Sequence, residues 1–163
     1  MNIFYLHEEP EICAQMHNDK HCVKMILESA QMLCTAHRAL DGNDKCDGLF
    51  MYKQAHLNHP STKWVRENIY NYKWMFDLFE ELCEEYTYRY EKAHTTDLKL
   101  RDILREPPLN IPMINQRRTN PPQCMPDEYK STDTIEAYRN YYMGEKSHFC
   151  VWKNRPTPTW YTK

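Results

Sequence analysis

The stretch from Gln15 to Leu40 is apolar almost all the way round a helix, and its polar residues fall on one narrow stripe. At about 100° per residue they share one line: His17, His21, Lys24, Glu28, Gln31, Thr35 and Arg38. This pattern is typical of a helix buried on most sides. Because imidazoles, an ammonium and a carboxylate lie together on it, the stripe predicts the wall of a partly buried site. The alternative is a solvated strip with a Lys24–Glu28 ion pair.

The composition predicts an all-α protein. Twelve Tyr, five Phe and four Trp stand against three Gly, and a sheet protein needs more turn glycines. The length of 163 residues predicts one compact domain, 1–163. Seven Cys without a CxxC pair indicate reduced core cysteines rather than a structural zinc site.

No stretch approaches the roughly 18 consecutive apolar residues of a membrane span, and no apolar leader opens the chain. We therefore expect no membrane partner and a cytoplasmic protein, in the host cytoplasm if a phage encodes it. We also expect a monomer without cofactor.

Two stretches carry the strongest helical periodicity and are predicted to pack against each other. The first, 11–40, is either continuous or broken near residues 18–19, and the second, 62–92, takes Ser61 as its N-cap. The second has an acidic face that would repel phosphates and should point away from any nucleic acid: Asp77, Glu80, Glu81, Glu84 and Glu85.

The other segments are predicted to be shorter. Six of the ten prolines fall within 106–131, and a long irregular loop in a compact domain is often functional. The remaining predictions are a short strand or extended run at 2–6, a polar loop at 41–48, and helices at 51–59, 97–105 and 132–144, the last covering the two long helices and followed by an aromatic tail.

Nucleic-acid contacts would have to come from local basic and aromatic groups, since the net charge is −2. Asn58-His59-Pro60 precedes a helix, and a helix N-terminus is a ready phosphate site. The C-terminal tail interleaves basic and aromatic residues, which suits stacking on bases. The predicted nucleic-acid-binding residues are Arg38, Lys53, His59, Lys63, Arg66, Arg117, Arg118, Arg155, Trp160 and Tyr161.

His17 and His21 stand at i and i+4, the spacing at which one helix offers two imidazoles to a metal ion. A zinc site needs at least a third protein ligand, which Glu28 or another histidine could supply. Lys24 lies between them on the stripe, and its ammonium would repel a dication. Hydrogen-bonding or acid–base histidines and plain surface histidines are the alternatives, and we predict no metal site.

Four short pieces of the chain share a pattern with one family. The chain opens with Met-Asn-Ile-Phe-Tyr-Leu-His, and its histidine-rich helix carries a central glutamate, Glu28. Tyr52-Lys53 and Asn58-His59-Pro60 precede the long central helix, and the chain closes with Arg155-Pro-Thr-Pro-Thr-Trp160-Tyr161. Together they resemble the phage and bacterial pyrimidine-dimer DNA glycosylases of the endonuclease V type. The closing piece has two residues inserted relative to that family's Arg-Pro-Thr-Trp-Tyr ending.

The resemblance implies a compact all-α enzyme without cofactor that acts on damaged or modified pyrimidines in double-stranded DNA. Such an enzyme kinks the duplex, flips a nucleotide and attacks the sugar C1′ with its N-terminal amine, while a carboxylate supports the imine and strand cleavage. Family members expose the amine of a small second residue after removal of Met1, whereas Asn2 is too bulky for this. The amine would then belong to Met1, or to Lys20 or Lys24 if burial lowers its pKa; the alternative is a relative with an altered or lost activity. The predicted catalytic residues are Met1, His17, Lys20, His21, Lys24 and Glu28.

Two other functional classes stay open. A helical metal-dependent hydrolase would use His17, His21 and a third ligand, and stoichiometric metal in the purified protein would favour it. A non-enzymatic phage-type binding protein would use the tail and the proline-rich loop, and would keep its effect after Glu28→Gln.

Overall fold

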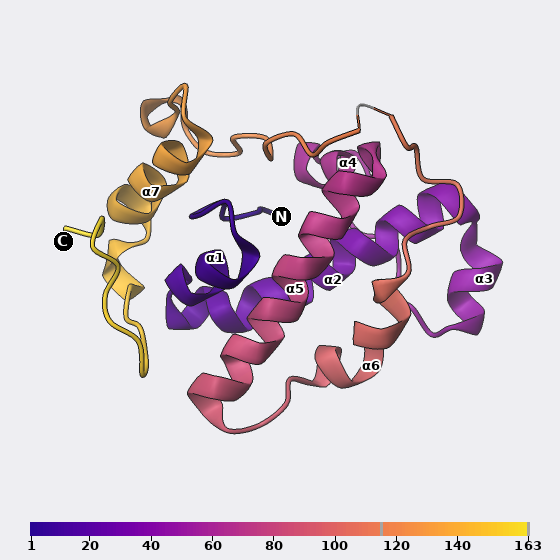
Figure 1. Ribbon diagram of the computed structural model, residues 1–163, viewed down its shortest axis with the longest axis horizontal. Helices are drawn as coiled ribbons and strands as arrows, with labels where there is room; N and C mark the ends of the chain where they lie inside the picture. The colour runs from indigo at the N-terminus through magenta and orange to yellow at the C-terminus, as the bar shows by residue number, and fades with distance from the viewer. Residues whose placement is uncertain (115, 163) are drawn as a thin grey trace.

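The computed structural model describes residues 1–114 and 116–162, and its elements are helices joined by loops (Figure 1). Within these residues no strand is formed, so the prediction of an all-α fold is confirmed. No helix in the described part is long and apolar enough to cross a membrane. In chain order the elements are α1 (Pro10–Met16), α2 (Asp19–Asp41), α3 (Asn43–Gly48), α4 (Pro60–Glu67), α5 (Ile69–Tyr90), α6 (Thr95–Arg105), the 3-10 turn η1 (Asp127–Tyr129), α7 (Thr134–Glu145) and the 3-10 turn η2 (Ser147–Phe149).

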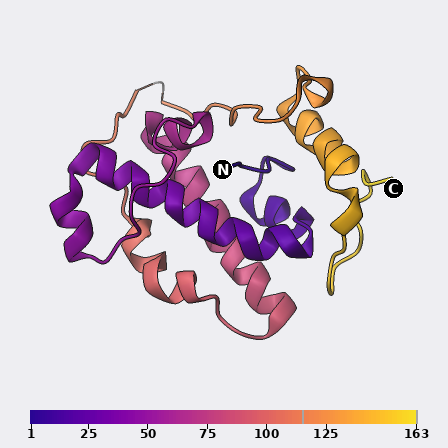
Figure 2. The same cartoon turned by 180° about the vertical axis from the view of Figure 1, so that it is seen from behind.

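The helices α2 and α5 cross near the centre of the molecule, with α5 in front in Figure 1 and α2 in front in Figure 2. The helix α1 packs on α5, and α4 packs on both α2 and α5. Apolar side chains at helical spacing from both crossing helices belong to one core cluster, among them Ile26, Leu33, Phe79 and Leu82. Burying each such side chain contributes roughly 1.5–3 kcal/mol, so the crossing fixes α2 firmly within the body.

Both long periodic stretches are divided by an asparagine. The break near residues 18–19 is present: Asn18 has an extended backbone, and its side chain caps α2 by accepting from the His21 N–H at 2.9 Å. The prediction of one continuous helix over 62–92 was wrong. Asn68 is extended there, and its side chain accepts from the N–H groups of Tyr70 and Asn71, because an asparagine that caps a new helix satisfies N–H groups that would otherwise be unpaired.

Three local predictions were wrong. Residues 43–48 form α3 rather than a loop, and α4 is capped by His59 rather than Ser61. Residues 51–59 are not helical, because side chains of α2 take the backbone groups that a helix would use. The Arg38 guanidinium donates to the carbonyls of Met51 and Tyr52, and Thr35 Oγ1 accepts from the Ala55 N–H.

The N-terminal run is extended and buried, as expected for a segment that enters the body. In Figure 1 it lies above α1, with α7 on one side and α5 on the other, and the Arg139 guanidinium of α7 donates to the Leu6 carbonyl at 2.9 Å. The helix α7 therefore packs on this run rather than covering the two long helices as predicted. The segment from 106 to 131 passes along one edge of the molecule to reach α7, and the part described has no regular structure other than η1.

Candidate active site

Glu28 lies in the middle of α2, with its side chain 15% exposed. Lys24, one turn earlier, has a side chain 60% exposed and places Nζ 3.4 Å from Glu28 Oε1, which is the ion pair named in the solvated-strip alternative. A helix-surface pair of this kind contributes only about 0.3–0.5 kcal/mol. The carboxylate therefore remains free to interact with another cation that approaches its open side.

The polar stripe and the exposed side of the 15–40 segment do not coincide. Val23 and Leu27 belong to the apolar arc that was expected to be buried, yet they are 38% and 42% exposed. Four stripe residues are buried, contrary to the solvated-strip alternative: His17, His21, Thr35 and Arg38. Groups from other elements bond three of them: the backbone of 51–55 bonds Thr35 and Arg38, and the Tyr142 hydroxyl bonds His21.

The two stripe histidines are neutral packing groups in the folded protein. His17 Nδ1 donates to the Cys13 carbonyl at 2.7 Å, and burial lowers the pKa of His17 to about 4. His21 Nδ1 is hydrogen-bonded to the Tyr142 hydroxyl at 2.7 Å, and its ring stacks on Phe4 with 4.1 Å between centroids. Burial, followed by nearby positive charges, lowers the pKa of His21 to about 2. The His21 contacts tie α2 to α7 and to the N-terminal run; a catalytic role for either ring stays a prediction.

His59 stands at the start of α4 and is half-buried. Its Nδ1 accepts from the Ser61 N–H at 3.1 Å, so in the neutral ring Nε2 carries the proton. The pKa of His59 is lowered by burial and then by the positive charges of the Met1 α-amine and His56, whereas the Glu28 carboxylate acts in the opposite direction. The chain start, the middle of α2 and the start of α4 thus lie within range of one another's charges.

The two lysines predicted as alternative amines lie near the surface. Lys20 is exposed and places Nζ 4.6 Å from the centre of the Phe149 ring. Lys24 is the exposed partner of Glu28. Met1, in contrast, is half-buried and packs against the core.

Arg38 and Arg66, two of the predicted nucleic-acid-binding arginines, each donate to two backbone carbonyls. Arg38 holds the 51–52 backbone, and Arg66 donates to the carbonyls of Leu57 at 2.8 Å and Thr62 at 3.2 Å. Both therefore brace the segment that leads to His59. Lys63 is exposed and, with Arg66 and Trp64, lines an open groove of about 750 Å³ beside α4.

The other predicted basic residues differ in their exposure and in the partners of their side chains. Arg117 is exposed. Lys53 is also exposed but lies 3.0 Å from Asp47. Arg118 donates to the Tyr5 hydroxyl at 2.9 Å, and its guanidinium carbon lies 5.2 Å from the centre of the Trp74 ring.

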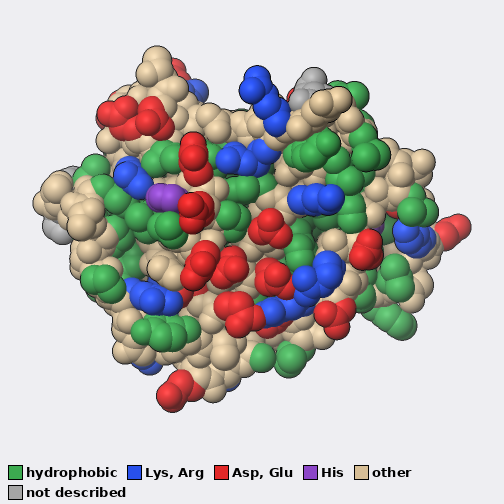
Figure 3. All heavy atoms as spheres, in the orientation of Figure 1, with side chains coloured by type: hydrophobic (Ala, Val, Ile, Leu, Met, Phe, Trp, Pro, Cys, Tyr) green, Lys and Arg blue, Asp and Glu red, His purple; other side chains and the backbone are tan. Residues whose placement is uncertain are grey.

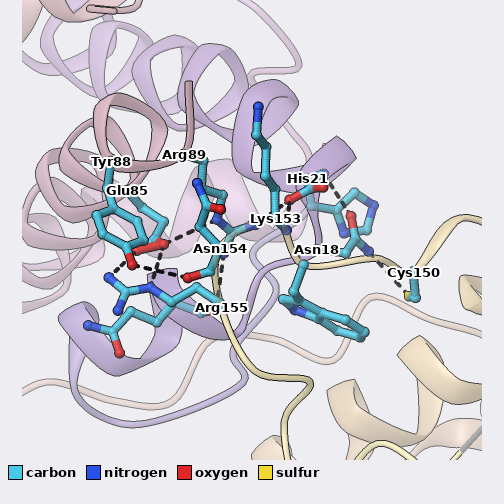
Figure 4. A network of polar contacts seen from close by, with 12 residues as sticks. Asn18, His21, Glu85, Tyr88, Arg89, Cys150, Lys153, Asn154 and Arg155 are labelled. Atoms are coloured by element: carbon cyan, nitrogen blue, oxygen red, sulfur yellow. Dashed lines mark hydrogen bonds and ion pairs between the residues drawn. The ribbon is translucent and has the colours of Figure 1, made fainter. Parts of the chain in front are cut away.

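The C-terminal tail folds back on the body instead of standing free (Figure 4). Arg155 pairs with the buried carboxylate of Glu85 on α5, which was predicted to belong to the exposed acidic face. Trp160 donates from Nε1 to Met16 Sδ at 3.4 Å, and Tyr161 lies edge-on to the Trp152 ring. All three predicted tail residues thus have partners within the chain.

Acidic side chains gather over α5 on the face seen in Figure 3. Asp77 and Glu84 are exposed there, and Glu80 and Glu81 are half-exposed. The pKa of Glu81 is raised by burial and then by the neighbouring carboxylates of Glu11, Glu80, Glu84 and Asp77. This negative surface disfavours contact with a phosphate backbone.

The residues that hold the chain start were not predicted. Asn2 bonds to Cys124 and to Tyr138 across more than a hundred residues of sequence, a relationship that no local pattern reports. The cap of α4 was not predicted either, although proline at the first helical position was an available signal.

Over residues 1–114 and 116–162, no three His, Cys, Asp or Glu side chains are grouped so as to hold a metal ion. The model of the family described as pyrimidine dimer DNA glycosylase matches residues 1–98, which include Met1, Glu28 and His59. No curated protein and no solved structure matches the chain.

Proposed function

The chain belongs to the pyrimidine dimer DNA glycosylase family, and from that premise we propose that it is a DNA glycosylase with AP-lyase activity on damaged pyrimidines in double-stranded DNA. In this proposal the Met1 α-amine is the nucleophile and Glu28 is the assisting carboxylate. The observation that supports it most is that the charges of both groups act on the His59 ring. The amine and the carboxylate thus lie in the neighbourhood of one imidazole, and the proposal is that they serve one reacting sugar.

The proposed reaction begins when the amine lone pair attacks C1′ and the electron pair of the glycosidic bond leaves with the base. The nitrogen loses a proton, the C1′–O4′ bond opens with O4′ taking up a proton, and an imine results. Removal of a C2′ proton then expels the 3′ phosphate by elimination, and hydrolysis of the imine restores the amine. Glu28 stabilises the cationic intermediate and moves protons.

The choice of Met1 over a lysine rests on chemistry and on burial. As a class, α-amines titrate at about 7.7–8.0 and lysines at about 10.4, so α-amines are far more often unprotonated at neutral pH. A lysine nucleophile needs a desolvated pocket or a neighbouring cation. Lys20 and Lys24 are both exposed, and the near neighbour of Lys24 is a carboxylate.

The exposed side of α2 suits a surface that meets DNA. Val23 and Leu27 are apolar yet exposed, and Leu27 directly precedes Glu28. Enzymes that kink a duplex often insert apolar side chains between base steps. In the proposal Leu27 is such a wedge, and DNA approaches away from the acidic surface of α5.

Borohydride trapping tests the function, because it reduces an imine to a stable adduct. We expect adducts with a duplex that carries one pyrimidine dimer and with one that carries an abasic site, and peptide mapping should place the adduct on Met1. Acetylation of the α-amine should abolish trapping; its persistence would indicate Lys20 or Lys24. An activity that chelators abolish, with no adduct on either duplex, would overturn the proposal.

A further inference from the structure

The Asn2 side chain uses both ends of its amide to fix the chain start. Nδ2 donates to the Cys124 carbonyl at 3.0 Å. Oδ1 lies 3.0 Å from the Tyr138 hydroxyl, which donates to it, and also accepts from the Ile3 N–H at 2.9 Å. Chain termini ordinarily fray unless they are tied down, and here the tie is one residue from the α-amine.

The Tyr138 hydroxyl makes this tie a rigid one. Tyr138 is fully buried on α7, and burial raises its pKa, so the hydroxyl remains a donor. Its proton is shared between Asn2 Oδ1 and the Pro122 carbonyl, and its oxygen accepts from the Cys124 N–H at 3.3 Å. One phenol thus joins the N-terminal run, α7 and the 122–124 backbone.

The same backbone reaches the turn that carries His59. The Cys124 thiol lies 3.5 Å from the Ser61 hydroxyl, and the Ser61 N–H donates to His59 Nδ1. Ile3, on the other side of Asn2, is buried in the core. Between the core and the α-amine, the Asn2 side chain is therefore the last group held by hydrogen bonds, and beyond it the Met1 side chain packs against the core.

We propose that Asn2 is a positioning residue that holds the Met1 α-amine for attack on C1′, with Tyr138 and the 122–124 backbone as its support. This inference rests on the proposed function. Its physical basis is that misplacing a reacting group by about 1 Å can lower a rate by about 10²-fold. Asn2 would act on the rate of attack without touching the substrate.

Two substitutions at Asn2 change its side-chain hydrogen bonds while Met1 remains the first residue. Asn2→Leu is similar in size and equally unsuited to Met1 removal, but it loses all three side-chain hydrogen bonds. Asn2→Asp keeps the acceptor for Ile3 and Tyr138, while it places an oxygen against the Cys124 carbonyl. Intact-mass measurement should show Met1 in both variants.

Tyr138→Phe removes the hydroxyl that donates to Asn2 and so tests the same tie from its partner. Tyr72→Phe is its matched control. Tyr72 is also fully buried, and its hydroxyl donates to the Leu104 carbonyl at 2.7 Å at the end of α6. Both variants lose one buried phenol hydroxyl. Only Tyr138 contacts the N-terminal run through that hydroxyl.

The experiment measures single-turnover borohydride trapping on an abasic duplex, together with DNA affinity by fluorescence anisotropy and thermal stability. We expect Asn2→Leu to slow trapping about 10²-fold with unchanged affinity, Asn2→Asp and Tyr138→Phe to slow it less, and Tyr72→Phe to trap at the wild-type rate.

Wild-type trapping by folded Asn2→Leu with Met1 present would overturn the positioning role and leave the proposed function standing. If trapping rate, DNA affinity and thermal stability all fall in parallel, and fall as much in Tyr72→Phe as in Tyr138→Phe, Asn2 has only a structural role and the proposal is overturned. If Asn2→Leu does not fold, Asn2→Asp and Tyr138→Phe carry the same comparison. No adduct with the wild-type protein would instead reject the proposed function itself.

Discussion

Arg155 binds Glu85 through two parallel hydrogen bonds, Nε to Oε1 at 2.9 Å and Nη2 to Oε2 at 3.1 Å. The same carboxylate accepts from Arg89 at 3.1 Å, and Arg89 also lies 2.9 Å from Asp19 at the start of α2 (Figure 4). The Asp19 side chain in turn accepts from the Lys153 N–H of the tail. Charges on α2, α5 and the tail thus form one network.

This network predicts unequal costs for its two arginines. Arg89→Ala leaves the buried Glu85 without its helix partner and should lower the free energy of unfolding by about 3–5 kcal/mol. Arg155→Ala leaves Glu85 paired with Arg89 and should cost about 1 kcal/mol. Urea unfolding at neutral pH measures both, and equal losses would contradict the arrangement.

Stability should fall as the pH is lowered below 6.5. In the unfolded chain a histidine takes up a proton near pH 6.5, whereas burial holds the pKa of His17 and His37 at about 4 and that of His21 at about 2. Between these pKa values the unfolded state binds more protons than the folded state. Each ring therefore lowers the free energy of unfolding by about 1.4 kcal/mol for every unit by which the pH is decreased.

Urea unfolding between pH 7.5 and 4.5 measures this slope. His21→Gln should make it shallower, and His148→Gln, which changes an exposed histidine, should leave it unchanged. A slope that does not respond to His21→Gln would show that other groups cause the loss.

The sequence predicted the helices better than their ends. Ile26, Leu33, Phe79 and Leu82 recur at helical spacing, and that periodicity is a property of the chain itself. The break at Asn68 could not be read in the same way, because an asparagine inside a helix and one that caps a helix look alike until the partner N–H groups are known.

The stripe shows why a site is harder to predict than a helix. Arg38 and Glu28 share one line of α2, but the 51–52 carbonyls cover the first while the second stays partly open. Which polar residue is covered depends on segments distant in sequence, and Asn2 with Tyr138 is the extreme case. Local periodicity therefore located the helix and listed its polar groups, but it could not separate bracing residues from candidate catalytic ones.

Lys63 and Arg66, neighbours in the groove beside α4, should behave differently. Lys63→Gln removes an exposed ammonium, so it should lower the slope of log affinity for DNA against log salt by about 1 and leave stability unchanged. Arg66→Gln loses the bonds to Leu57 and Thr62 and should lower the free energy of unfolding by about 1.5–3 kcal/mol. Anisotropy titrations at several salt concentrations and urea unfolding measure the two effects; the reverse pattern would mean that Arg66 is the DNA contact.

Leu27→Ala should separate base extrusion from later chemistry. An abasic site has no damaged base to extrude, so trapping on it should proceed at the wild-type rate, while excision from a dimer-containing duplex should slow about 10-fold, the effect of losing roughly 1.4 kcal/mol of transition-state stabilisation. Leu98→Ala, which truncates an exposed leucine of α6, is the control. If Leu27→Ala acts at the wild-type rate on both duplexes, or is slowed equally on both, Leu27 is not a wedge for base extrusion.

Glu28→Gln should abolish turnover and spare binding. The amide keeps the size of the side chain but can neither stabilise a cationic imine nor transfer a proton, so single-turnover excision should fall by about 10²–10⁴-fold. DNA affinity should hold or rise slightly, because a negative charge beside Lys24 is removed and no phosphate contact is lost. Glu91→Gln, at an exposed position after α5, controls for the charge change. Normal excision by Glu28→Gln would remove Glu28 from the chemistry, and loss of affinity without loss of the excision rate would make it a binding residue instead.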